Sequence, residues 1–180
     1  PEGAYVGDFL TDKALAFIEQ SRRDEKPFFL YMPYFLIHGP LEAKPGDLDH
    51  FQKKLPHGVD PKNALWGAMT KSLDDNVGRI MQKLSELGID SDTLVIFTSD
   101  NGAVITESND FNRPLRMGKG ELYEGGIRVP CVMRWPGKIP AGSSNNEISG
   151  IIDMLPTFCS MAGADVPSDR VIDGRDILPI

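Results

Sequence analysis

The pattern of hydrophobic and polar positions is clearest over residues 61–87. Apolar side chains recur there every three or four residues, at Leu65, Met69, Leu73, Val77, Ile80, Met81, Leu84 and Leu87. This spacing places them on one stripe of a helix. Pro61 near the start and Gly88 just past the end are the usual residues at such boundaries. We therefore predict an amphipathic helix over residues 61–87.

Further elements follow from shorter patterns. Apolar residues within 11–23 recur with helical spacing, and we interpret Thr11 as the N-cap of this helix. A final helix is expected over residues 153–161. Short apolar runs typical of buried strands occupy residues 28–32, 93–98 and 127–135. The alternation of strands and helices predicts an α/β fold with a sheet covered by helices.

The stretch from residue 42 to residue 61 differs from its surroundings. It is rich in proline, glycine, lysine and aspartate, which predicts a long irregular surface segment. Loops of that length inside a compact domain are often functional. We expect this segment to border a substrate cleft.

Charge and cysteine content narrow the possible partners. The 180 residues include 19 Lys and Arg against 26 Asp and Glu, a formal net charge of −7, which argues against a large basic face for nucleic acid. No apolar run reaches the roughly 18 residues of a membrane-spanning helix, so no membrane span is expected. The two cysteines, Cys131 and Cys159, lack the spacing of a zinc site, and we expect both to be core residues.

Candidate chemistry follows the predicted strand at residues 93–98. Asp100, Asn101 and Gly102 come directly after it, where ligands usually bind in open α/β sheets. The same three residues also suit a plain tight turn. Alternatively, the carboxylate and amide oxygens are ligands of the kind that calcium takes, although two ligands cannot fill its shell of roughly six to eight oxygens.

Two cationic candidates accompany this loop. Lys119 lies between Gly118 and Gly120, which allow a turn that can point the ammonium group into a cleft. His38 precedes Gly39 in a loop. Each residue taken alone is also typical of an ordinary surface loop. Together, a histidine, hard oxygen ligands and a lysine are what the hydrolysis of an anionic ester requires.

Seven segments, in order along nearly the whole chain, resemble the type I sulfatases, the arylsulfatase family of the alkaline-phosphatase-like superfamily. They are FFLYMPYFLIHGP from Phe28, SLDDNVG from Ser72, TSDNG from Thr98, LRMGKGELYEGGIRVP from Leu115, WPGK from Trp135, IDMLPT from Ile152 and DGRD from Asp173. The resemblance implies an α/β sandwich with a mainly parallel central sheet. It also implies a sulfuric ester hydrolase.

The resemblance assigns roles to matching positions. Asp100 and Asn101 match ligands of one calcium ion that also touches the sulfate. Lys119 matches a lysine that contacts a sulfate oxygen near the leaving oxygen, and His38 matches a sulfate-binding histidine that is a candidate proton donor. A sulfate ester concentrates charge on oxygens in its transition state, so these roles are physically reasonable. Glu124 and Arg128 are interpreted as structural residues.

One departure from the family is large. Its nucleophile is a formylglycine made from a Cys/Ser-x-Pro/Ala-x-Arg motif, and neither Cys131 nor Cys159 begins such a motif. In the family this motif lies upstream of the position of His38, and a small C-terminal subdomain follows the position of residues 173–180. We therefore expect residues 1–180 to be the middle to later part of a single catalytic domain. The nucleophile is expected outside it.

Alternatives remain open at this stage. A phosphomonoesterase or phosphodiesterase of the same superfamily is one, although Asn101 stands where those relatives commonly have a zinc-binding histidine. A non-catalytic sulfatase-like binding protein is another. The alcohol is expected to be recognised by residues 42–60 and 105–113, which suit an aryl or a carbohydrate sulfate. The resemblance also implies an exported or lysosomal protein.

Overall fold

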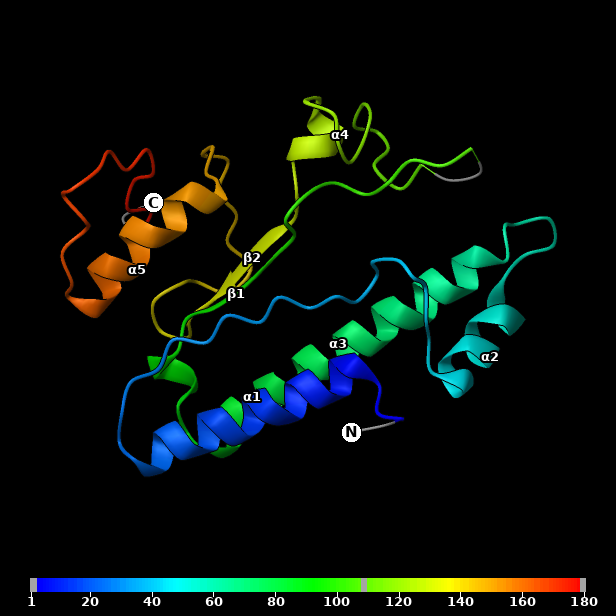
Figure 1. The fold of residues 1–180 in the computed structure, drawn as a ribbon. Coiled ribbons are helices and arrows are strands. Elements are labelled where there is room, and N and C mark those ends of the chain that lie inside the picture. The colour runs from blue at the N-terminus through cyan, green and yellow to red at the C-terminus, as the bar shows by residue number, and fades with distance from the viewer. Residues whose placement is uncertain (1–2, 108–109, 179–180) are drawn as a thin grey trace. The chain divides into compact units, whose positions relative to one another are not determined.

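The computed structural model describes residues 3–107 and 110–178. Their contacts define two compact units, one within Pro1–Val95 and one within Ile96–Ile180. The first unit is built from helices, whereas the second contains a two-stranded sheet and short helices (Figure 1). The elements are α1 Val6–Arg23, α2 Pro45–Lys54, α3 Lys62–Glu86, η1 Asp90–Asp92, β1 Val95–Thr98, α4 Glu124–Ile127, β2 Cys131–Arg134, η2 Ile151–Asp153 and α5 Met154–Ala162.

The core of the first unit is formed where α1 and α3 pack against each other (Figure 1). α3 confirms the helix predicted from the apolar stripe. The buried apolar residues are Ala14, Ile18, Leu36, Ala64, Ala68, Met69 and Leu84. Burial of a large side chain such as Ile18 or Leu84 contributes roughly 1.5–3 kcal/mol.

α1 begins earlier than the sequence pattern predicted. Its N-cap is Tyr5, and Thr11 is fully buried inside the helix. The Thr11 hydroxyl donates to the carbonyl oxygen of Gly7 at 2.8 Å and lies 2.6 Å from the hydroxyl of Tyr34. The predicted N-cap was therefore wrong, because a threonine within a helix can satisfy its hydroxyl on the preceding turn.

The strand predicted at residues 28–32 is an extended segment instead. It belongs to neither strand of the sheet that the described residues form. Its side chains alternate as in a strand: Phe29 and Tyr31 are 65% and 75% exposed, whereas Phe28 and Leu30 are half-buried. The prediction of a buried strand was therefore wrong.

The segment over residues 42–61 is less irregular than predicted, because α2 forms within it. Pro45 occupies the first turn, where its missing N–H costs nothing. Asp47 lies in the first turn, and Lys53 and Lys54 lie in the last, which matches the helix dipole. The proline, aspartate and lysine residues that indicated a loop therefore stand at the two ends of a short helix. This helix packs on α3.

The second unit has a small sheet in which β1 pairs with β2. These strands confirm the apolar runs at residues 93–98 and 127–135, with shorter bounds. Cys131 on β2 is exposed and Cys159 on α5 is half-buried, so the prediction that both are core residues was wrong. The reason is that side chains of the described residues leave much of β2 uncovered, including Val132, which is 61% exposed.

The C-terminal part of the second unit is fastened to α5 by buried polar groups. The Asp153 carboxylate, 6% exposed, accepts hydrogen bonds from the backbone N–H groups of Gly150 and Arg175 at 2.7 and 2.8 Å. Thr157 accepts one from the backbone N–H of Ile177 at 3.1 Å.

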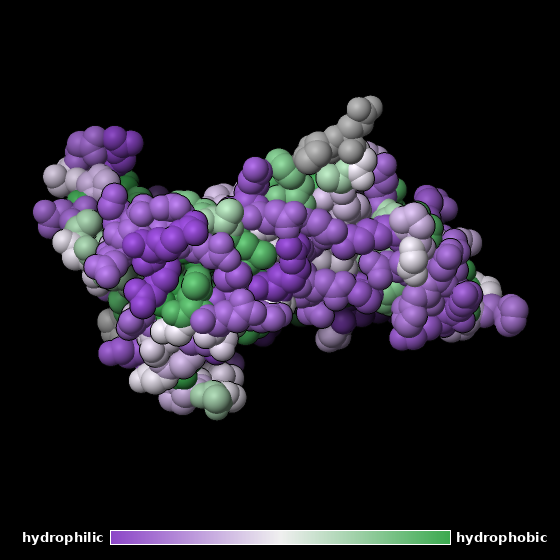
Figure 2. Space-filling model, turned by 90° about the horizontal axis from the view of Figure 1, so that it is seen from below, coloured by the Kyte–Doolittle hydropathy of each residue, from purple (hydrophilic) through white to green (hydrophobic). Residues whose placement is uncertain are grey.

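Figure 2 shows hydrophilic residues over most of the face that it draws, with exposed apolar residues between them.

Candidate functional site

The loop after β1 is held by backbone and hydroxyl hydrogen bonds. The Thr98 hydroxyl donates to the carbonyl oxygen of Pro130 at 3.0 Å, and the Ser99 hydroxyl donates to that of Asn101 at 2.9 Å. The backbone N–H of Gly102 donates to the carbonyl oxygen of Gly126 at 2.9 Å. The loop is thus fixed at both ends without using the side chains of Asp100 and Asn101.

Glycine at position 102 is required by close packing. A Cβ atom there would lie 1.7 Å from the carbonyl oxygen of Gly125, a distance that no side chain can occupy. Gly125 and Gly126 are buried at the start of α4, and a Cβ on Gly125 would lie 1.9 Å from the carbonyl oxygen of Met117. The loop after β1 and the Gly-rich block therefore form one backbone cluster.

Lys119 lies in this cluster. Its backbone N–H donates to the carbonyl oxygen of Ala103 at 3.0 Å, which ties the lysine turn to the loop that carries Asp100 and Asn101. Gly118 is buried, and a Cβ atom on it would lie 2.3 Å from the Ala103 oxygen, whereas Gly120 has φ +92°. The flanking glycines allow the turn, as predicted, and the Lys119 side chain is exposed.

Asn112 is a positioning residue that no sequence pattern indicated. Its side-chain oxygen accepts from the backbone N–H of Ala103 at 2.9 Å, and its amide nitrogen donates to the Ala103 carbonyl at 2.8 Å. Asn112 therefore bonds both the N–H and the carbonyl of Ala103, the residue whose carbonyl also accepts from the Lys119 backbone N–H. Asn112 belongs to residues 105–113, which were predicted to recognise the alcohol of the substrate; residues 108 and 109 of that range lie outside the described residues. In the sequence, Asn112 is one asparagine in a short polar loop, and such residues are too common to be singled out.

Asp100 and Asn101 present oxygen donors in this loop. The Asp100 side chain is exposed and Asn101 is half-buried. Throughout residues 3–107 and 110–178, neither the Asp100 carboxylate nor the Asn101 amide group takes a hydrogen bond or an ion pair. A plain turn would use such side chains on its own backbone. The arrangement leaves both oxygens available to a ligand.

The donors fit a hard cation in kind but not in number. Carboxylate and amide oxygens suit calcium, which needs roughly six to eight oxygens. Among the residues that the structure describes, no three or more His, Cys, Asp or Glu side chains gather as a metal site would require. A complete shell needs further ligands in addition to Asp100 and Asn101.

His38 lies in the first unit, in the segment between the extended residues 28–32 and α2. Its backbone N–H donates to the carbonyl oxygen of Phe35 at 3.1 Å, and its Nδ1 lies 2.8 Å from the carbonyl oxygen of Gly39. Since a carbonyl oxygen only accepts, Nδ1 carries a proton.

Glu124 and Arg128, which were interpreted as structural residues, are the first residue of α4 and its C-cap. The Glu124 carboxylate and the Arg128 guanidinium are 3.4 Å apart, and both side chains are exposed. The pair spans one turn of the short helix, which agrees with a local structural role. Nearby, the Arg116 guanidinium lies 3.9 Å from the centre of the Tyr123 ring, as a cation–π contact across the Lys119 turn.

Comparison with known proteins gives consistent matches. A family model described as Sulfatase matches residues 3–164. N-acetylgalactosamine-6-sulfatase of Mus musculus is 40% identical over 179 residues, which cover 98% of this chain and 32% of that protein. Steryl-sulfatase of Mus musculus is 38% identical over 178 residues, which cover 95% of this chain and 27% of that protein. The chain thus spans about a third of the length of these curated relatives.

A solved structure matches the fold closely. The crystal structure of Ps i-CgsB superposes with a TM-score of 0.90 at 34% identity, covering 99% of this chain and 38% of that one. The same protein has been solved in complex with k-i-k-neocarrahexaose. The α/β, alkaline-phosphatase-like fold class predicted from the sequence is confirmed as a partial domain. The small sheet of the described residues is part of it.

Proposed function

Because this chain belongs to the sulfatase family, we propose that the full-length protein hydrolyses a sulfate monoester, using Asp100, Asn101, Lys119 and His38. The observation that carries this proposal is the backbone cluster around Gly102. It joins the loop of Asp100 and Asn101 to the turn of Lys119, and within the described residues it leaves the two oxygen donors without protein partners. Such a preorganised set suits an anionic ligand bound with a cation.

Asp100 and Asn101 are proposed to hold one calcium ion, with the remaining ligands supplied from outside this chain. When bound, the ion supplies positive charge to the sulfate oxygens. The carboxylate contributes charge, whereas the neutral amide of Asn101 contributes an oxygen without adding charge. The fixed loop keeps both donors in place, so binding the ion does not require the backbone to reorganise.

Lys119 and His38 are proposed to act on the sulfate group itself. The Lys119 ammonium neutralises charge on a sulfate oxygen as the ester bond breaks. His38 gives a proton from Nε2 to the departing alcohol, while its Nδ1–H stays bonded to the Gly39 carbonyl. The nucleophile, a formylglycine by family resemblance, is proposed to lie in a part of the protein that precedes this chain.

The alcohol part of the substrate is not fixed by the family. One relative is named for a steryl ester and another for a sulfated amino sugar, and a third protein was solved with k-i-k-neocarrahexaose. We propose that residues 42–60, including α2, and residues 105–113 select the alcohol. A panel of aryl, steryl and sugar sulfates tested on the full-length protein would rank these classes by kcat/KM.

Where the protein acts is also proposed by resemblance, as an exported or lysosomal enzyme. Within residues 3–107 and 110–178, the structure has no helix long and apolar enough to cross a bilayer.

Selectivity between sulfate and phosphate esters tests the reaction class. Full-length protein is assayed with 4-nitrophenyl sulfate and 4-nitrophenyl phosphate. We expect a higher kcat/KM for the sulfate, because Asn101 adds no charge where a phosphatase commonly has a zinc ligand. Faster phosphate cleavage would identify a phosphatase. Binding of sulfated compounds with no turnover of either ester would identify a non-catalytic relative.

A further inference from the structure

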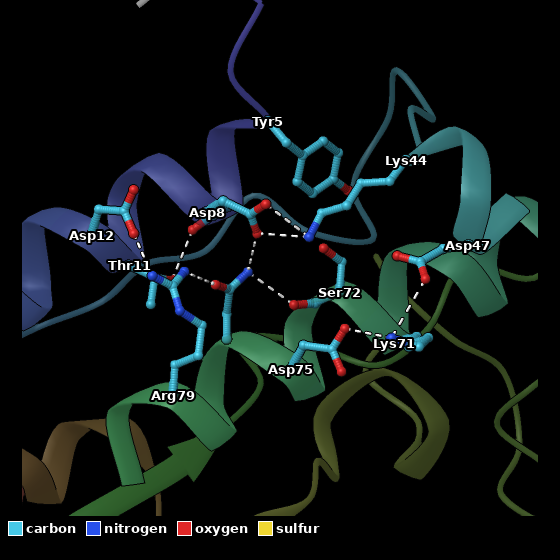
Figure 3. A network of polar contacts seen from close by, with 12 residues as sticks. Tyr5, Asp8, Thr11, Asp12, Lys44, Asp47, Lys71, Ser72, Asp75 and Arg79 are labelled. Carbon is cyan, nitrogen blue, oxygen red and sulfur yellow. Dashed lines mark hydrogen bonds and ion pairs between the residues drawn. The ribbon is translucent and has the colours of Figure 1, made fainter. Parts of the chain in front are cut away.

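We propose that Asp8 is a positioning residue for His38, because with Lys44 it clamps the segment that carries the histidine onto α1. The inference rests on the proposed function of His38 and concerns only the first unit. Asp8 lies in the first turn of α1, and the Lys44 ammonium bonds its carboxylate at 2.8 Å (Figure 3). Lys44 is six residues beyond His38 and is the N-cap of α2.

The segment over residues 34–44 is held to α1 on both sides of His38. Before the histidine, the Tyr34 hydroxyl lies 2.6 Å from that of Thr11, and Leu36 is 6% exposed. A Cβ on Gly7 would lie 2.9 Å from a methyl carbon of Leu36, so the leucine packs directly on the helix backbone. After the histidine, the Lys44 bond to Asp8 is the ionic attachment to the helix.

A second contact strengthens the attachment after His38. The Tyr5 hydroxyl donates to the carbonyl oxygen of Glu42 at 3.1 Å, and the Lys44 ammonium lies 5.3 Å from the centre of the Tyr5 ring. The arc between Tyr34 and Lys44 is therefore closed at both ends. Loss of the Lys44 ion pair would leave the hydrogen bond from Tyr5 to the Glu42 carbonyl to hold the segment after His38, and so weaken that attachment.

Asp8 is itself held in place by α3. The amide nitrogen of Asn76, which is fully buried, donates to Asp8 Oδ1 at 2.9 Å and to the Ser72 carbonyl at 2.9 Å. The Arg79 guanidinium donates to the Asn76 side-chain oxygen at 3.1 Å. Asn76 thus has its donors and its acceptor engaged, and it aims one donor at Asp8. Three parts of the first unit, α1, α3 and the His38 segment, meet at this carboxylate.

The charge state of Asp8 supports the geometry. Burial alone would raise its pKa, but the hydrogen bonds from Lys44 and Asn76 and the charges of Lys44 and Arg79 outweigh burial. The net effect holds the pKa of Asp8 below its ordinary value. The carboxylate is therefore ionised at neutral pH and pairs with Lys44 as a charge-assisted contact.

A neighbouring carboxylate provides a matched control. Asp12 is one turn further along α1 and pairs with Arg79 of α3. That pair joins α1 to α3, as the bond between Asp8 and Asn76 does, whereas Lys44 pairs with Asp8. Asp12→Asn reports the cost of weakening the helix interface alone. Asp8→Asn adds the release of the His38 segment.

The test measures leaving-group dependence in the full-length protein. Wild type, Asp8→Asn, Asp12→Asn and Lys44→Met are assayed with 4-nitrophenyl sulfate, whose leaving group needs little protonation, and with an alkyl sulfate, whose leaving group needs a proton donor. A general acid contributes about 10²–10⁴-fold, so its displacement is expected to cost kcat about tenfold more on the alkyl sulfate than on the aryl sulfate. We expect this pattern for Asp8→Asn and Lys44→Met but not for Asp12→Asn.

Hydrogen exchange provides a readout that needs no turnover. Peptides covering residues 34–44 are expected to exchange faster in Asp8→Asn and Lys44→Met than in Asp12→Asn. If wild type cleaves neither sulfate, the proposed function fails, and exchange still decides whether the clamp exists. Equal kcat losses on both substrates, or unchanged exchange over residues 34–44, would overturn the inference. If Asp8→Asn does not fold, Lys44→Met decides alone, since it leaves the bond from Asn76 to Asp8 in place.

Discussion

At the scale of single residues, glycines fix the geometry of the candidate site. A methyl group on Gly102 would overlap the carbonyl oxygen of Gly125, and one on Gly125 would overlap the carbonyl oxygen of Met117. The loop that carries the oxygen donors and the turn of Lys119 are therefore packed and hydrogen-bonded to the same backbone cluster.

Gly102→Ala tests this contact. The new Cβ would meet the Gly125 carbonyl at 1.7 Å, and such overpacking costs about 1–3 kcal/mol or more. We expect a lower Tm and a large loss of sulfate release from the full-length protein. Gly46→Ala in α2 is the control, because no atom lies within 4 Å of its Cβ position and alanine favours a helix. Equal effects of the two changes would contradict the packing argument.

Lys119→Met tests the role of the ammonium group. Methionine keeps much of the side-chain length, and the exposed position predicts little change in Tm. Removal of one preorganised charge contact is expected to lower kcat about 10²–10³-fold. Lys138→Met, at another exposed lysine of the second unit, is expected to leave kcat unchanged. A change confined to KM would assign Lys119 to binding alone.

Candidate site residues could be nominated from the sequence, but the residues that support their backbones could not. Asp100, Asn101 and Lys119 stand in recognisable motifs, and the structure places their backbones in one cluster. Asn112 was missed because an asparagine in a short polar loop is common, and Asp8 was missed because its partners lie in other parts of the first unit. Asp8 meets Asn76 across 68 residues, a pairing that no local pattern indicates.

At the scale of elements, side-chain hydrogen bonds join α5 and its N-cap to residues 175–177. Asp153 accepts from Gly150 and Arg175, and Thr157 accepts from Ile177. The backbone N–H groups of Arg175 and Gly150 hold the pKa of Asp153 below its ordinary value, despite its burial. This carboxylate is therefore a source of acid sensitivity in the second unit.

The sign of the effect follows from the lowered pKa. The folded form binds its proton less readily than the unfolded form, so the contribution of Asp153 to stability is fully present above the ordinary value of 3.8 and is lost as the pH falls through the lower folded pKa. Asp153→Asn removes this charge. We expect the Tm difference between wild type and Asp153→Asn to shrink as the pH falls below about 4. A difference that is constant from pH 7 to pH 3 would contradict the assignment.

Helices with a long apolar stripe were predictable, whereas elements that depend on distant partners were not. α3 and α5 match their predicted ranges within a few residues. α2 was missed because its Pro and Gly residues indicate turns when taken alone. The extended residues 28–32 show a strand period, but whether a strand forms depends on a neighbour that a local pattern cannot specify.

At the scale of the whole molecule, apolar surface is unevenly buried. Glycine and proline aside, the buried apolar residues all belong to the first unit, within the part of the chain that the structure describes. In the second unit, Leu122, Ile148 and Val171 are 91%, 90% and 88% exposed. Large apolar side chains are therefore far more exposed in the second unit than those in the core of the first.

The isolated 180 residues are therefore expected to be inactive. They lack a Cys/Ser-x-Pro/Ala-x-Arg motif, and their exposed apolar groups favour aggregation. We expect no turnover of a chromogenic aryl sulfate by the purified fragment, with or without Ca²⁺. Calcium-dependent turnover by the fragment would show that the nucleophile lies within this chain.

The calcium dependence of sulfate release by the full-length protein is the decisive measurement for the proposed site. Protein stripped with a chelator is assayed while free Ca²⁺ is restored, for wild type, Asp100→Ala and the control Glu124→Ala. We predict that wild type and Glu124→Ala regain activity at similar Ca²⁺ concentrations, whereas Asp100→Ala stays inactive or needs far more Ca²⁺. Sulfate release that is unaffected by chelation, or equally restored in Asp100→Ala, would contradict the proposed calcium site.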